Sequence, residues 1–227
     1  MKKKVENLVI FGLGDHAKVI VSEIKQIKNY KVRGFVCNNI NYSQKTYLKN
    51  NSFKYFGNIK NFFRFHNNKK LKGIIAVGAN YKREKIVKEI KLLNKNFKWA
   101  KVISKNTVIN GKVKFGAGSV LISGSIVNTG TIIKKHCLIN TKTVIDHDNI
   151  FENYSSTGPG SITGGNVKVG KRSHLGIGSV VKNKININPD TIIGGKSFVN
   201  KNCKSNSIYF GVPAKWKKSR KKNQKYL

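Results

Sequence analysis

The sequence VLISGSIVNTGTIIKKHCLINTKTVIDHDNIF, residues 120–151, places an aliphatic residue at every sixth position. Counted in steps of six from Val102 to Ile162, nine of eleven positions are aliphatic, and the exceptions are Lys114 and Ser156. Neither a helix, with its period of 3.6, nor an ordinary strand, with its period of two, repeats in this way. A hexapeptide repeat is typical of a parallel β-helix, in which each short strand points one aliphatic side chain inward and turns bring the next strand round.

The repeat loses its register near ITGGNVKVG, residues 162–170, and resumes through Leu175, Val181 and Ile192 or Ile193. This slip predicts a local loop. A β-sandwich of short strands would show period two and irregular turn spacing, so the count of matches favours the β-helix.

The first hundred residues show a different pattern, in which strand and helix signals alternate. Short apolar runs typical of buried strands occupy residues 7–11, 31–36 and 73–78. Apolar residues with helical spacing occupy residues 19–27 and 86–93. Such alternation predicts a small parallel sheet.

The change of period near residue 100 divides the chain. With 227 residues, the protein is long enough to bury a sizeable core in one large domain or two small ones. We predict a Rossmann-like α/β domain over residues 1–99, an all-β parallel β-helix over residues 100–216 and a basic tail over residues 217–227.

The formal net charge of +36 suggests a nucleic-acid partner at first sight. The positive charge is almost all lysine, however, and it is spread along the whole chain together with many Asn and Ile residues, as an AT-rich coding sequence would give. A diffuse, solvated surface is therefore the better interpretation, and no nucleic acid is expected. A basic nucleic-acid-binding protein stays as the non-enzymatic alternative. Anionic small substrates would be attracted to either kind of protein.

Cysteine usage and hydropathy limit the remaining classes. Cys37, Cys137 and Cys203 are odd in number and far apart, so neither a disulfide nor a metal site is indicated. No apolar run approaches the roughly 18 to 20 residues of a membrane span, and the first residues lack a cleavage site for export. We expect a cytoplasmic protein.

The first predicted strand is followed by a glycine turn that could receive a phosphate group. Gly12-Leu13-Gly14-Asp15-His16-Ala17 is a G-x-G-x-x-A sequence that opens a helix. A dinucleotide site also needs an acidic residue about 20 positions later, yet none occurs between Glu23 and Glu84. A nicotinamide-dependent reductase is thus disfavoured, while a phosphate or diphosphate ligand and a turn used for packing alone both stay open.

Taken in order, four segments resemble the bacterial sugar acetyltransferases with a left-handed β-helix. They are GLGDHAK (12–18), AVGAN (76–80), the repeats around INTKTVIDHD (139–148) and FGVPAKW (210–216). The resemblance runs from about residue 6 to residue 216. That family includes UDP-4-amino-sugar N-acetyltransferases and sialic-acid O-acetyltransferases. The left hand of the coil is implied by the resemblance alone, because right-handed crossovers are otherwise the rule.

The resemblance implies that His147 is the general base and that Asp148 orients its ring. Acetyl transfer from coenzyme A needs a proton removed from the attacking amine or hydroxyl, and an imidazole titrates near neutral pH. A neighbouring carboxylate fixes the tautomer and stabilises the imidazolium. This role would explain why three of the 9 acidic residues, Asp146, Asp148 and Glu152, lie within six positions of His147.

Other roles are carried over by position. The resemblance places Asn140 near the acceptor group and implies that backbone amides of the coil stabilise the oxyanion. The residues expected to contact acetyl-CoA are Ser156, in the place of a family histidine, then Gly165, Gly176 and Ile177 along the pantetheine, with Pro213 and Lys215 in a segment that closes over it. The residues expected to hold the nucleotide sugar are Gly12, Gly14, His16 and Lys18, with Asn38 and Asn80 nearby. The family forms homotrimers with the active site between adjacent coils and uses no metal, so we expect the same here.

Two departures from the family pattern limit the assignment. Some relatives have a second histidine nine residues after the base, contacting the acetyl group, where this chain has Ser156. Relatives often end the second strand with aspartates, where this chain has Cys37 and Asn38, so the nucleotide and the sugar are open. The sequence favours N-acetylation of a UDP- or dTDP-linked 4-amino sugar. O-acetylation of a sialic acid or related sugar is the alternative, and a structural β-helix without activity is disfavoured by the INTKTVIDHD segment.

Overall fold

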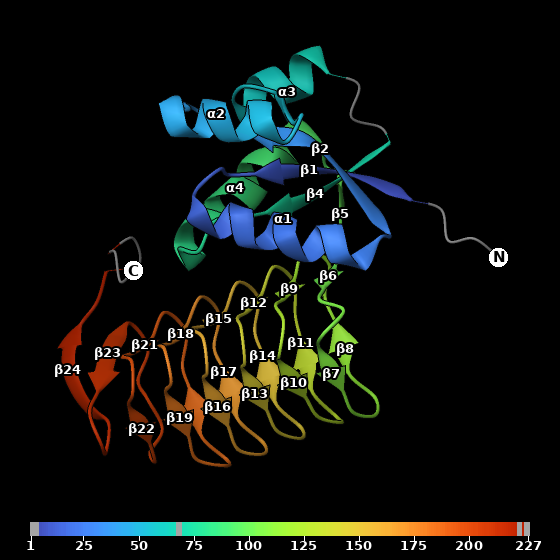
Figure 1. Cartoon of the computed structure of the whole chain (residues 1–227). Coiled ribbons are helices and arrows are strands. Elements are labelled where there is room, and N and C mark those ends of the chain that lie inside the picture. The colour runs from blue at the N-terminus through green and yellow to red at the C-terminus, as the bar shows by residue number, and fades with distance from the viewer. Residues whose placement is uncertain (1–4, 67–69, 222–223, 225–227) are drawn as a thin grey trace.

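The computed structural model describes residues 5–66, 70–221 and 224. An α/β domain lies on one side of a long stack of short strands (Figure 1). The elements of the α/β domain are β1 (Glu6–Phe11), α1 (Asp15–Ile27), β2 (Tyr30–Val36), α2 (Tyr42–Asn50), β3 (Lys54–Tyr55), α3 (Ile59–Phe65), β4 (Leu71–Ile75), α4 (Asn80–Leu93) and β5 (Lys98–Trp99). They confirm the parallel sheet, whose strand order is β3-β2-β1-β4-β5.

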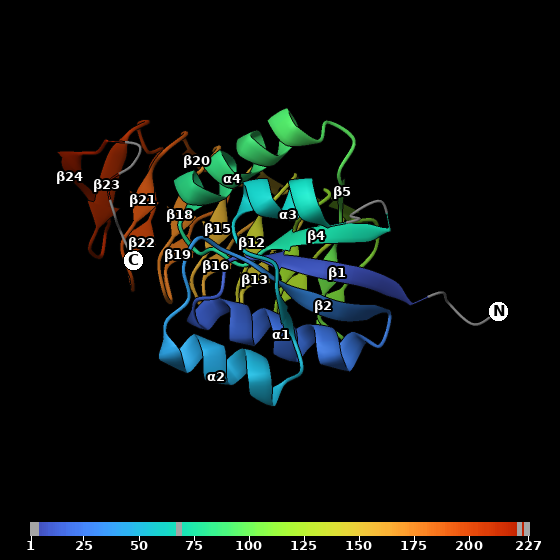
Figure 2. The ribbon, with the colours of Figure 1, turned by 90° about the horizontal axis from the view of Figure 1, so that it is seen from above.

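Helices cover both faces of this sheet, with α1 and α2 on one side and α3 and α4 on the other (Figure 2). Leu8 and Ile10 of β1 point into the core below α1, while Val9 and Phe11 point into the core below α3 and α4. Burial on both faces is why these strands read as continuous apolar runs. The carboxyl ends of the strands meet at one edge, where a ligand of such a sheet is held.

The β-helix begins at Val102 and makes one turn of the coil every eighteen residues, because each strand pairs in parallel with the strand three positions later. Its strands are β6 (Val102–Ile103), β7 (Val108–Ile109), β8 (Lys114–Phe115), β9 (Val120–Leu121), β10 (Ile126–Val127), β11 (Ile132–Ile133), β12 (Leu138–Ile139), β13 (Val144–Ile145), β14 (Ile150–Phe151), β15 (Ser156–Thr157), β16 (Ile162–Thr163), β17 (Lys168–Val169), β18 (His174–Leu175), β19 (Val180–Val181), β20 (Asn186–Ile187), β21 (Ile192–Ile193) and β22 (Phe198–Val199). The hairpin of β23 (Ser207–Phe210) and β24 (Lys215–Ser219) ends it.

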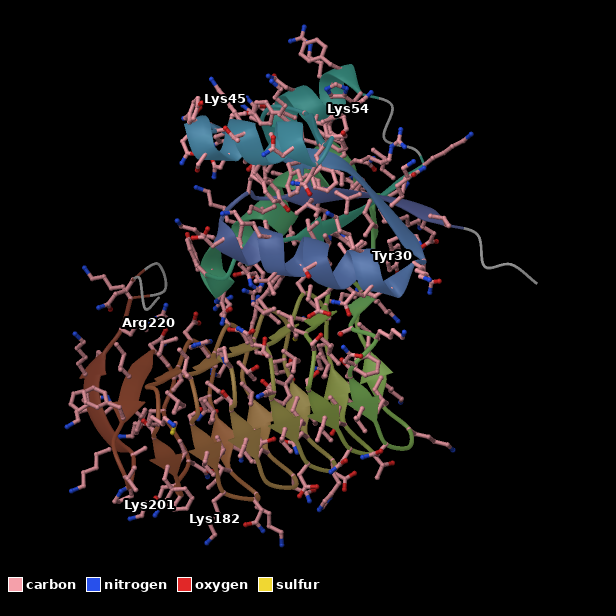
Figure 3. All side chains as sticks on the ribbon, in the orientation of Figure 1. Tyr30, Lys45, Lys54, Lys182, Lys201 and Arg220 are labelled. Carbon is pink, nitrogen blue, oxygen red and sulfur yellow. The ribbon has the colours of Figure 1, made fainter. Side chains whose placement is uncertain are left out.

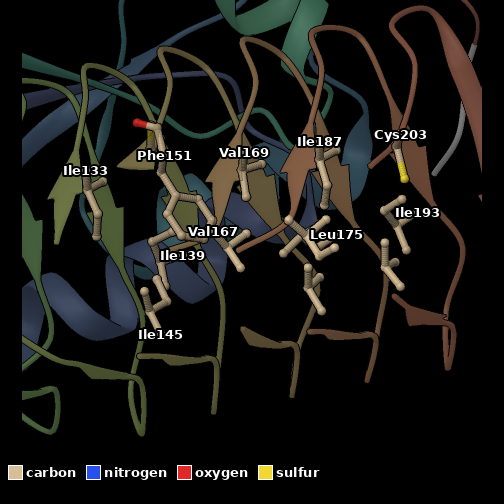
Figure 4. Packing of buried hydrophobic residues seen from close by; sticks show 14 of the residues in the cluster. Ile133, Ile139, Ile145, Phe151, Val167, Val169, Leu175, Ile187, Ile193 and Cys203 are labelled. Carbon is tan, nitrogen blue, oxygen red and sulfur yellow. The ribbon is translucent and has the colours of Figure 1, made fainter. Parts of the chain in front are cut away.

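The period of six is confirmed, but the prediction of which residue points inward was one position out of phase. The buried core is built mainly from the second residue of each strand, such as Ile133, Ile139, Ile145, Phe151 and Leu175 (Figure 4). The residues counted from the sequence are the first residues of the strands and face outward. Both positions of most strands are aliphatic, so the repeat alone did not distinguish them.

The predicted slip and local loop near residues 162–170 are wrong. Strands β15, β16, β17 and β18 follow one another at the same spacing of six residues. The apparent slip arises because several outward positions here are polar, namely Ser156, Lys168 and His174. The aliphatic residues that continue the repeat are then the inward ones, one position later in each strand.

The three faces of the β-helix differ in what they present outward. The covered face (β6, β9, β12, β15, β18 and β21) packs under the α/β domain, and its outward residues are buried. The apolar face (β7, β10, β13, β16, β19 and β22) presents Val108, Ile126, Val144, Ile162, Val180 and Phe198 in one row. The mixed face (β8, β11, β14, β17 and β20) presents Lys114, Ile132, Ile150, Lys168 and Asn186.

Two edges of the β-helix border the apolar face. The glycine edge, made of the turns at 140–143, 158–161, 176–179 and 194–197, joins the apolar face to the covered face. The histidine edge, made of the turns at 146–149, 164–167, 182–185 and 200–203, joins it to the mixed face. In a triangular coil the histidine edge lies opposite the covered face, and therefore opposite the α/β domain.

A buried arginine of α4 fastens the α/β domain to the covered face. Arg83 is 3% exposed and donates to the carbonyl oxygens of His136, Tyr154 and Ser155 at 2.9–3.2 Å. It also donates to Oδ1 of Asn80. Because these acceptors belong to both domains, a lost guanidinium would leave several buried carbonyl groups without a charged donor.

A second arginine joins α4 to two successive coils. Arg172 donates to Glu84 Oε2 of α4 at 2.7 Å and to Asp190 Oδ1 of the next coil at 2.7 Å. Burial alone would raise the pKa of Glu84, but its hydrogen bond with Lys171 and its ion pair with Arg172 hold that pKa below the usual value. The ionised carboxylate is therefore the form that the folded protein favours.

We predict that Arg172→Ala lowers the free energy of unfolding by about 3–5 kcal/mol, because it leaves buried carboxylates without their main partner. Urea unfolding measures this loss. Exposed Arg33 supplies the matched control, since Arg33→Ala should change stability by less than about 0.5 kcal/mol. The folded-state pKa of Glu84 lies below its unfolded value of 4.5, so the stabilisation is present at neutral pH and is lost as the pH falls below 4.5. Equal losses in the two variants would contradict the role of Arg172.

Candidate active site

His147 and Asp148 form a hydrogen-bonded pair on the histidine edge, in the turn after β13. Nδ1 of His147 lies 2.8 Å from Oδ2 of Asp148. The side chains are 49% and 55% exposed, so the pair faces outward rather than into the core. With Nδ1–H donating to the carboxylate, Nε2 is the atom free to accept a proton.

Neighbouring coils leave room for this pair only because two positions are glycine. A Cβ built on Gly165, in the next coil, would lie 2.5 Å from Nε2 of His147. A Cβ on Gly130, in the preceding coil, would collide with Oδ1 of Asp148. Asp148 itself has a φ of 55°, a left-handed conformation that aspartate tolerates better than most residues. The coil thus fixes both side chains from above and below.

The carboxylates around His147 set its charge. The hydrogen bond to Asp148 raises the pKa of His147, and the negative charges of Asp146 and Asp148 add to the increase. Asp146 accepts from Asn128 Nδ2 at 3.1 Å and from the His147 backbone N–H at 2.8 Å, which lowers the pKa of that carboxyl. Glu152 instead pairs with Lys134 at 2.8 Å, on the mixed face. Two of the three clustered carboxylates therefore act on the imidazole directly.

Asn140, the third predicted catalytic residue, lies on the glycine edge. Its Oδ1 accepts from the Thr141 backbone N–H at 2.9 Å, and its own backbone N–H donates to Thr157 Oγ1. One strand of the apolar face, β13, separates it from His147 within the chain. A single chain does not bring these two predicted residues together.

The positions predicted to contact acetyl-CoA are divided in the same way. Gly165 is on the histidine edge, whereas Gly176 and Ile177 are on the glycine edge, where Ile177 is 62% exposed. A Cβ on Gly176 would meet backbone atoms of Gly194 and Gly195 at 2.5–2.6 Å, so this glycine lets two coils approach. The backbone amides and the exposed Ile177 side chain of the glycine edge fit the pantetheine arm of a coenzyme A, which has both amide groups and methylene groups.

Pro213 and Lys215 lie farther along, at the turn and the second strand of the final hairpin, and both are exposed. Residues 217–219, which the sequence assigns to a basic tail, belong to strand β24. The remainder of that predicted tail falls mostly outside the described residues.

The glycine turn of the α/β domain opens onto a cavity of 590 Å³. Gly12 has a φ of 103°, and a Cβ there would meet Val77 Cγ2 at 2.8 Å, so the turn requires glycine. Gly14 precedes α1, and no atom lies within 4 Å of a Cβ built on it, which leaves its backbone accessible to a ligand. Lys18 extends from the same helix and pairs with Asp15 at 3.2 Å on the surface.

The imidazole of His16 is neutral at ordinary pH. Burial and the charge of Arg83 lower the pKa of His16 to about 4. Among the described residues, its buried Nε2 has no hydrogen-bond partner. A neutral ring with an unused nitrogen beside the glycine turn can bind a polar group of a substrate.

Residues after β2 form one wall of the cavity. Asn38 and Asn39 line it and are exposed, and Cys37 is half-buried beside them. The sequence analysis did not single out Lys82 and Lys85 of α4, which line the opposite wall. Two lysines that line the same cavity as Gly12 suit a diphosphate, and Glu89 is the carboxylate in that lining.

Asn80 and Ser156 are used inside the protein. Asn80 is 1% exposed, and its amide nitrogen donates to the carbonyl oxygens of Arg172 and Ser173 at 3.0 Å. Ser156 lies on the covered face, 1% exposed, and donates to Asn80 Oδ1 at 2.8 Å. These side chains hold the two domains together, so they face neither the cavity nor the histidine edge. The sequence did contain one signal for such buried contacts, which is the scarcity of arginine. Three of the five arginines, at positions 83, 172 and 220, are buried.

Comparison with known proteins shows the same arrangement elsewhere. Residues 7–90 match the PglD N-terminal domain family. PerB from Caulobacter crescentus, in complex with CoA and GDP-perosamine, is 26% identical, with a TM-score of 0.83 over 96% of this chain and 100% of that one. The chain is therefore similar to sugar N-acetyltransferases over almost its whole length. The predicted resemblance, the enzyme class of acyltransferase and the fold of an α/β domain with a left-handed β-helix are thereby confirmed.

Two more distant solved structures share the fold. The acetyltransferase domain of PglB from Neisseria gonorrhoeae is 21% identical, with a TM-score of 0.81 over 93% of this chain and 99% of that one. WeeI from Acinetobacter baumannii is 20% identical, with a TM-score of 0.79 over 93% of this chain and 100% of that one. Within the described part of this chain, no helix is long and apolar enough to cross a membrane.

With His147 as the predicted general base, Asp148→Asn should shift the acidic limb of the pH profile of kcat/KM to lower pH. His147 must be neutral to accept a proton, so activity rises as the pH passes its pKa, and the carboxylate raises that pKa. The maximal rate should also fall roughly tenfold or more, because the ring loses its fixed tautomer. Glu152→Gln is the matched control and should leave the limb in place. An unmoved limb in Asp148→Asn would show that the pair does not govern the reaction.

Proposed function

We propose that the protein transfers the acetyl group of acetyl-CoA to the amine of a nucleotide-linked 4-amino sugar. The observation that carries this proposal is the exposed His147–Asp148 pair, with Nδ1 bound and Nε2 open. A histidine held by a carboxylate in this way can act as a general base. The similarity to sugar N-acetyltransferases indicates which reaction it would serve. A reaction that consumes acetyl-CoA agrees with the predicted cytoplasmic location.

The proposed reaction uses His147 twice. The amine nitrogen attacks the thioester carbonyl carbon while Nε2 of His147 takes one proton from the nitrogen, and Asp148 stabilises the imidazolium. Backbone N–H groups of the coil stabilise the negative oxygen of the tetrahedral intermediate. When the carbon–sulfur bond breaks, the imidazolium returns the proton to the departing thiolate, which leaves an amide and free CoA.

We place the nucleotide in the 590 Å³ cavity, with its phosphates on the glycine turn and near Lys82 and Lys85. PerB binds GDP-perosamine, whose sugar carries an amine, and it covers almost the whole of this chain. This relative supports a nucleotide diphosphate sugar as the substrate class. Asn38 and Asn39, in place of a carboxylate, are the groups that would distinguish uridine, thymidine and guanosine nucleotides.

We further propose a homotrimer assembled through the apolar face. Val108, Ile162 and Val180 on this face are 49%, 42% and 37% exposed in the single chain. A continuous row of exposed aliphatic side chains marks an interface in a soluble protein. Cyclic packing of the apolar faces would bring the histidine edge of one chain to the glycine edge of the next. It would unite His147 and Gly165 with Asn140 and Ile177, which the single chain keeps apart.

The same assembly would bring the substrate to the base. The glycine turn belongs to the domain on the covered face, opposite the histidine edge of its own chain. A nucleotide sugar held there would point toward the His147 of a neighbouring chain. Each active site would then combine residues from two chains.

Thiol release from acetyl-CoA, measured across UDP-, dTDP- and GDP-linked 4-amino sugars and free sialic acids, tests the reaction. We expect turnover with one amino sugar and a loss of about 10²- to 10⁴-fold in kcat for His147→Ala. His66→Ala, which removes another exposed histidine, is the control and should retain activity. Turnover with a hydroxyl acceptor alone would reassign the protein to O-acetylation, and silence with every acceptor would refute the proposal.

Mixed trimers test the shared site. Gly14→Asp places a carboxylate where phosphate should bind, and it has room to do so, because no atom lies within 4 Å of the added Cβ. Gly14→Asp and His147→Ala should each be inactive alone. Mixed in equal amounts, they should restore about one quarter of wild-type activity, since one site in four receives both intact parts. Absence of any restored activity would show that each chain contains its whole site.

A further inference from the structure

The hairpin at the end of the β-helix exposes large apolar side chains. Strands β23 and β24 pair antiparallel and close the stack, at the end farthest from β6 (Figure 1). Phe210 is 46% exposed, Val212 75% and Trp216 51%. The catalytic proposal does not use Phe210 or Trp216, and several exposed apolar side chains gathered on one hairpin are more informative than single ones scattered over a surface.

Lysines surround these apolar side chains. All five residues of β24 are exposed, and three of them are Lys215, Lys217 and Lys218. Lys196, Lys201 and Lys204 are exposed on the turns of the last coil, and Lys201 projects from the side away from the α/β domain (Figure 3). From residue 191 to residue 227 the sequence contains no aspartate or glutamate. The positive charge here is therefore unopposed, unlike that around His147.

The hairpin is anchored, so its outward side chains keep a fixed position. Tyr209 of β23 is buried, and its hydroxyl accepts from the Lys204 backbone N–H at 3.1 Å. Arg220, directly after β24, is 6% exposed and donates to the Asp190 carbonyl oxygen at 3.2 Å. The ammonium group of Lys217 lies 4.8 Å from the centre of the Phe210 ring, which joins an aromatic and a cationic group on one surface.

We propose that this end of the β-helix, formed by the hairpin and the turns of the last coil, docks on a lipid membrane with anionic headgroups. Aromatic and aliphatic side chains can enter the boundary between headgroups and acyl chains, where tryptophan is enriched in proteins. Lysines around them bind the phosphates of anionic lipids, and their aliphatic stems can lie along the apolar boundary. Neither interaction needs a membrane-spanning segment.

Two features favour a lipid surface over a nucleic acid. Val212 is the most exposed of the three apolar side chains. Its side chain has no charged or hydrogen-bonding group that could bind a phosphate or a base edge, whereas it can enter a bilayer. The charged groups of β24 are all lysine, which acts as a point charge, while the bidentate arginine preferred in nucleic-acid readout is used internally at Arg220.

Assembly would strengthen the contact. If the protein forms the cyclic trimer of the proposed function, its three hairpins lie at the same end of the particle and face one plane. Three weak sites that engage one surface together bind far more tightly than one. This step rests on the proposed trimer, while docking of the single hairpin does not.

Co-sedimentation of the full chain with vesicles tests the proposal. Vesicles of phosphatidylcholine with one quarter phosphatidylglycerol should bind the protein, and pure phosphatidylcholine should not. Lys217→Glu/Lys218→Glu should weaken binding by more than about 20-fold, since each lysine near an anionic surface contributes roughly fivefold and the loss of two such charges alone gives about 25-fold. Raising the salt from about 0.1 M to about 1 M should release the protein. The matched control is Lys105→Glu/Lys112→Glu, which reverses two exposed lysines at the opposite end of the β-helix.

Tryptophan fluorescence reports the apolar part of the contact. The chain has two tryptophans, and Trp99 packs inside the α/β domain against Phe11 and Phe97. Anionic vesicles should shift the emission of Trp216 to shorter wavelength, and Trp216→Phe should abolish the shift. KM for acetyl-CoA should be unchanged in the Lys217→Glu/Lys218→Glu variant.

Three results would overturn the proposal. Equal loss of vesicle binding in the two lysine variants would show that the charge acts diffusely. Binding of single-stranded DNA through Lys217 and Lys218, without vesicle binding, would assign the surface to nucleic acid. A raised KM for acetyl-CoA with unchanged vesicle binding would assign it to the cofactor. Vesicle binding does not depend on turnover, so an inactive protein that still binds vesicles would refute the catalytic proposal alone.

Discussion

The stacking of each coil on the next controls most side-chain contacts of the β-helix. A residue lies against the residue eighteen positions away, because parallel strands of successive coils pair without a change of register. His147 lies against Gly165, and Asp148 against Gly130. The same spacing joins Arg172 to Asp190 and Asn128 to Asp146. A regular backbone thereby turns a one-dimensional repeat into the hydrogen-bonded His147–Asp148 pair, the second carboxylate beside it, and a buried ion pair.

The sequence predicted the period, the two-part fold and the position of His147 and Asp148, because a repeat and a rare cluster of carboxylates are local patterns. The inward phase was not predictable, since strands such as Ile132–Ile133 carry two aliphatic residues and only packing decides which is inside. Ser156 and His174 contributed to the wrong prediction of a slip in the repeat, for a related reason. They are polar on an outward face, and they are buried only because a second domain covers that face.

Residues predicted to bind ligands met different outcomes for physical reasons. Gly12 and Gly14 keep accessible backbone at the carboxyl edge of the sheet, as their motif requires. Asn80 has the same family resemblance, yet its amide is used by the covered face of the β-helix. A motif shows that the position of a residue matters, but it does not show whether the side chain contacts a ligand or the neighbouring domain. The buried arginines gave a clearer signal, since a chain that uses lysine almost everywhere else retains Arg83 and Arg172 where several acceptors must be bound at once.

The reversal of the chain at its last strand has a consequence for the solubility of the whole molecule. A stack of parallel coils ends in unpaired backbone groups, which another molecule could extend without limit. Strand β24 runs antiparallel to β23 and covers that end of the covered-face sheet. Its outer edge offers three lysines in five residues, so a second chain that approached in line would meet repulsion instead of an open ladder. The hairpin therefore protects this sheet against extension by a second chain.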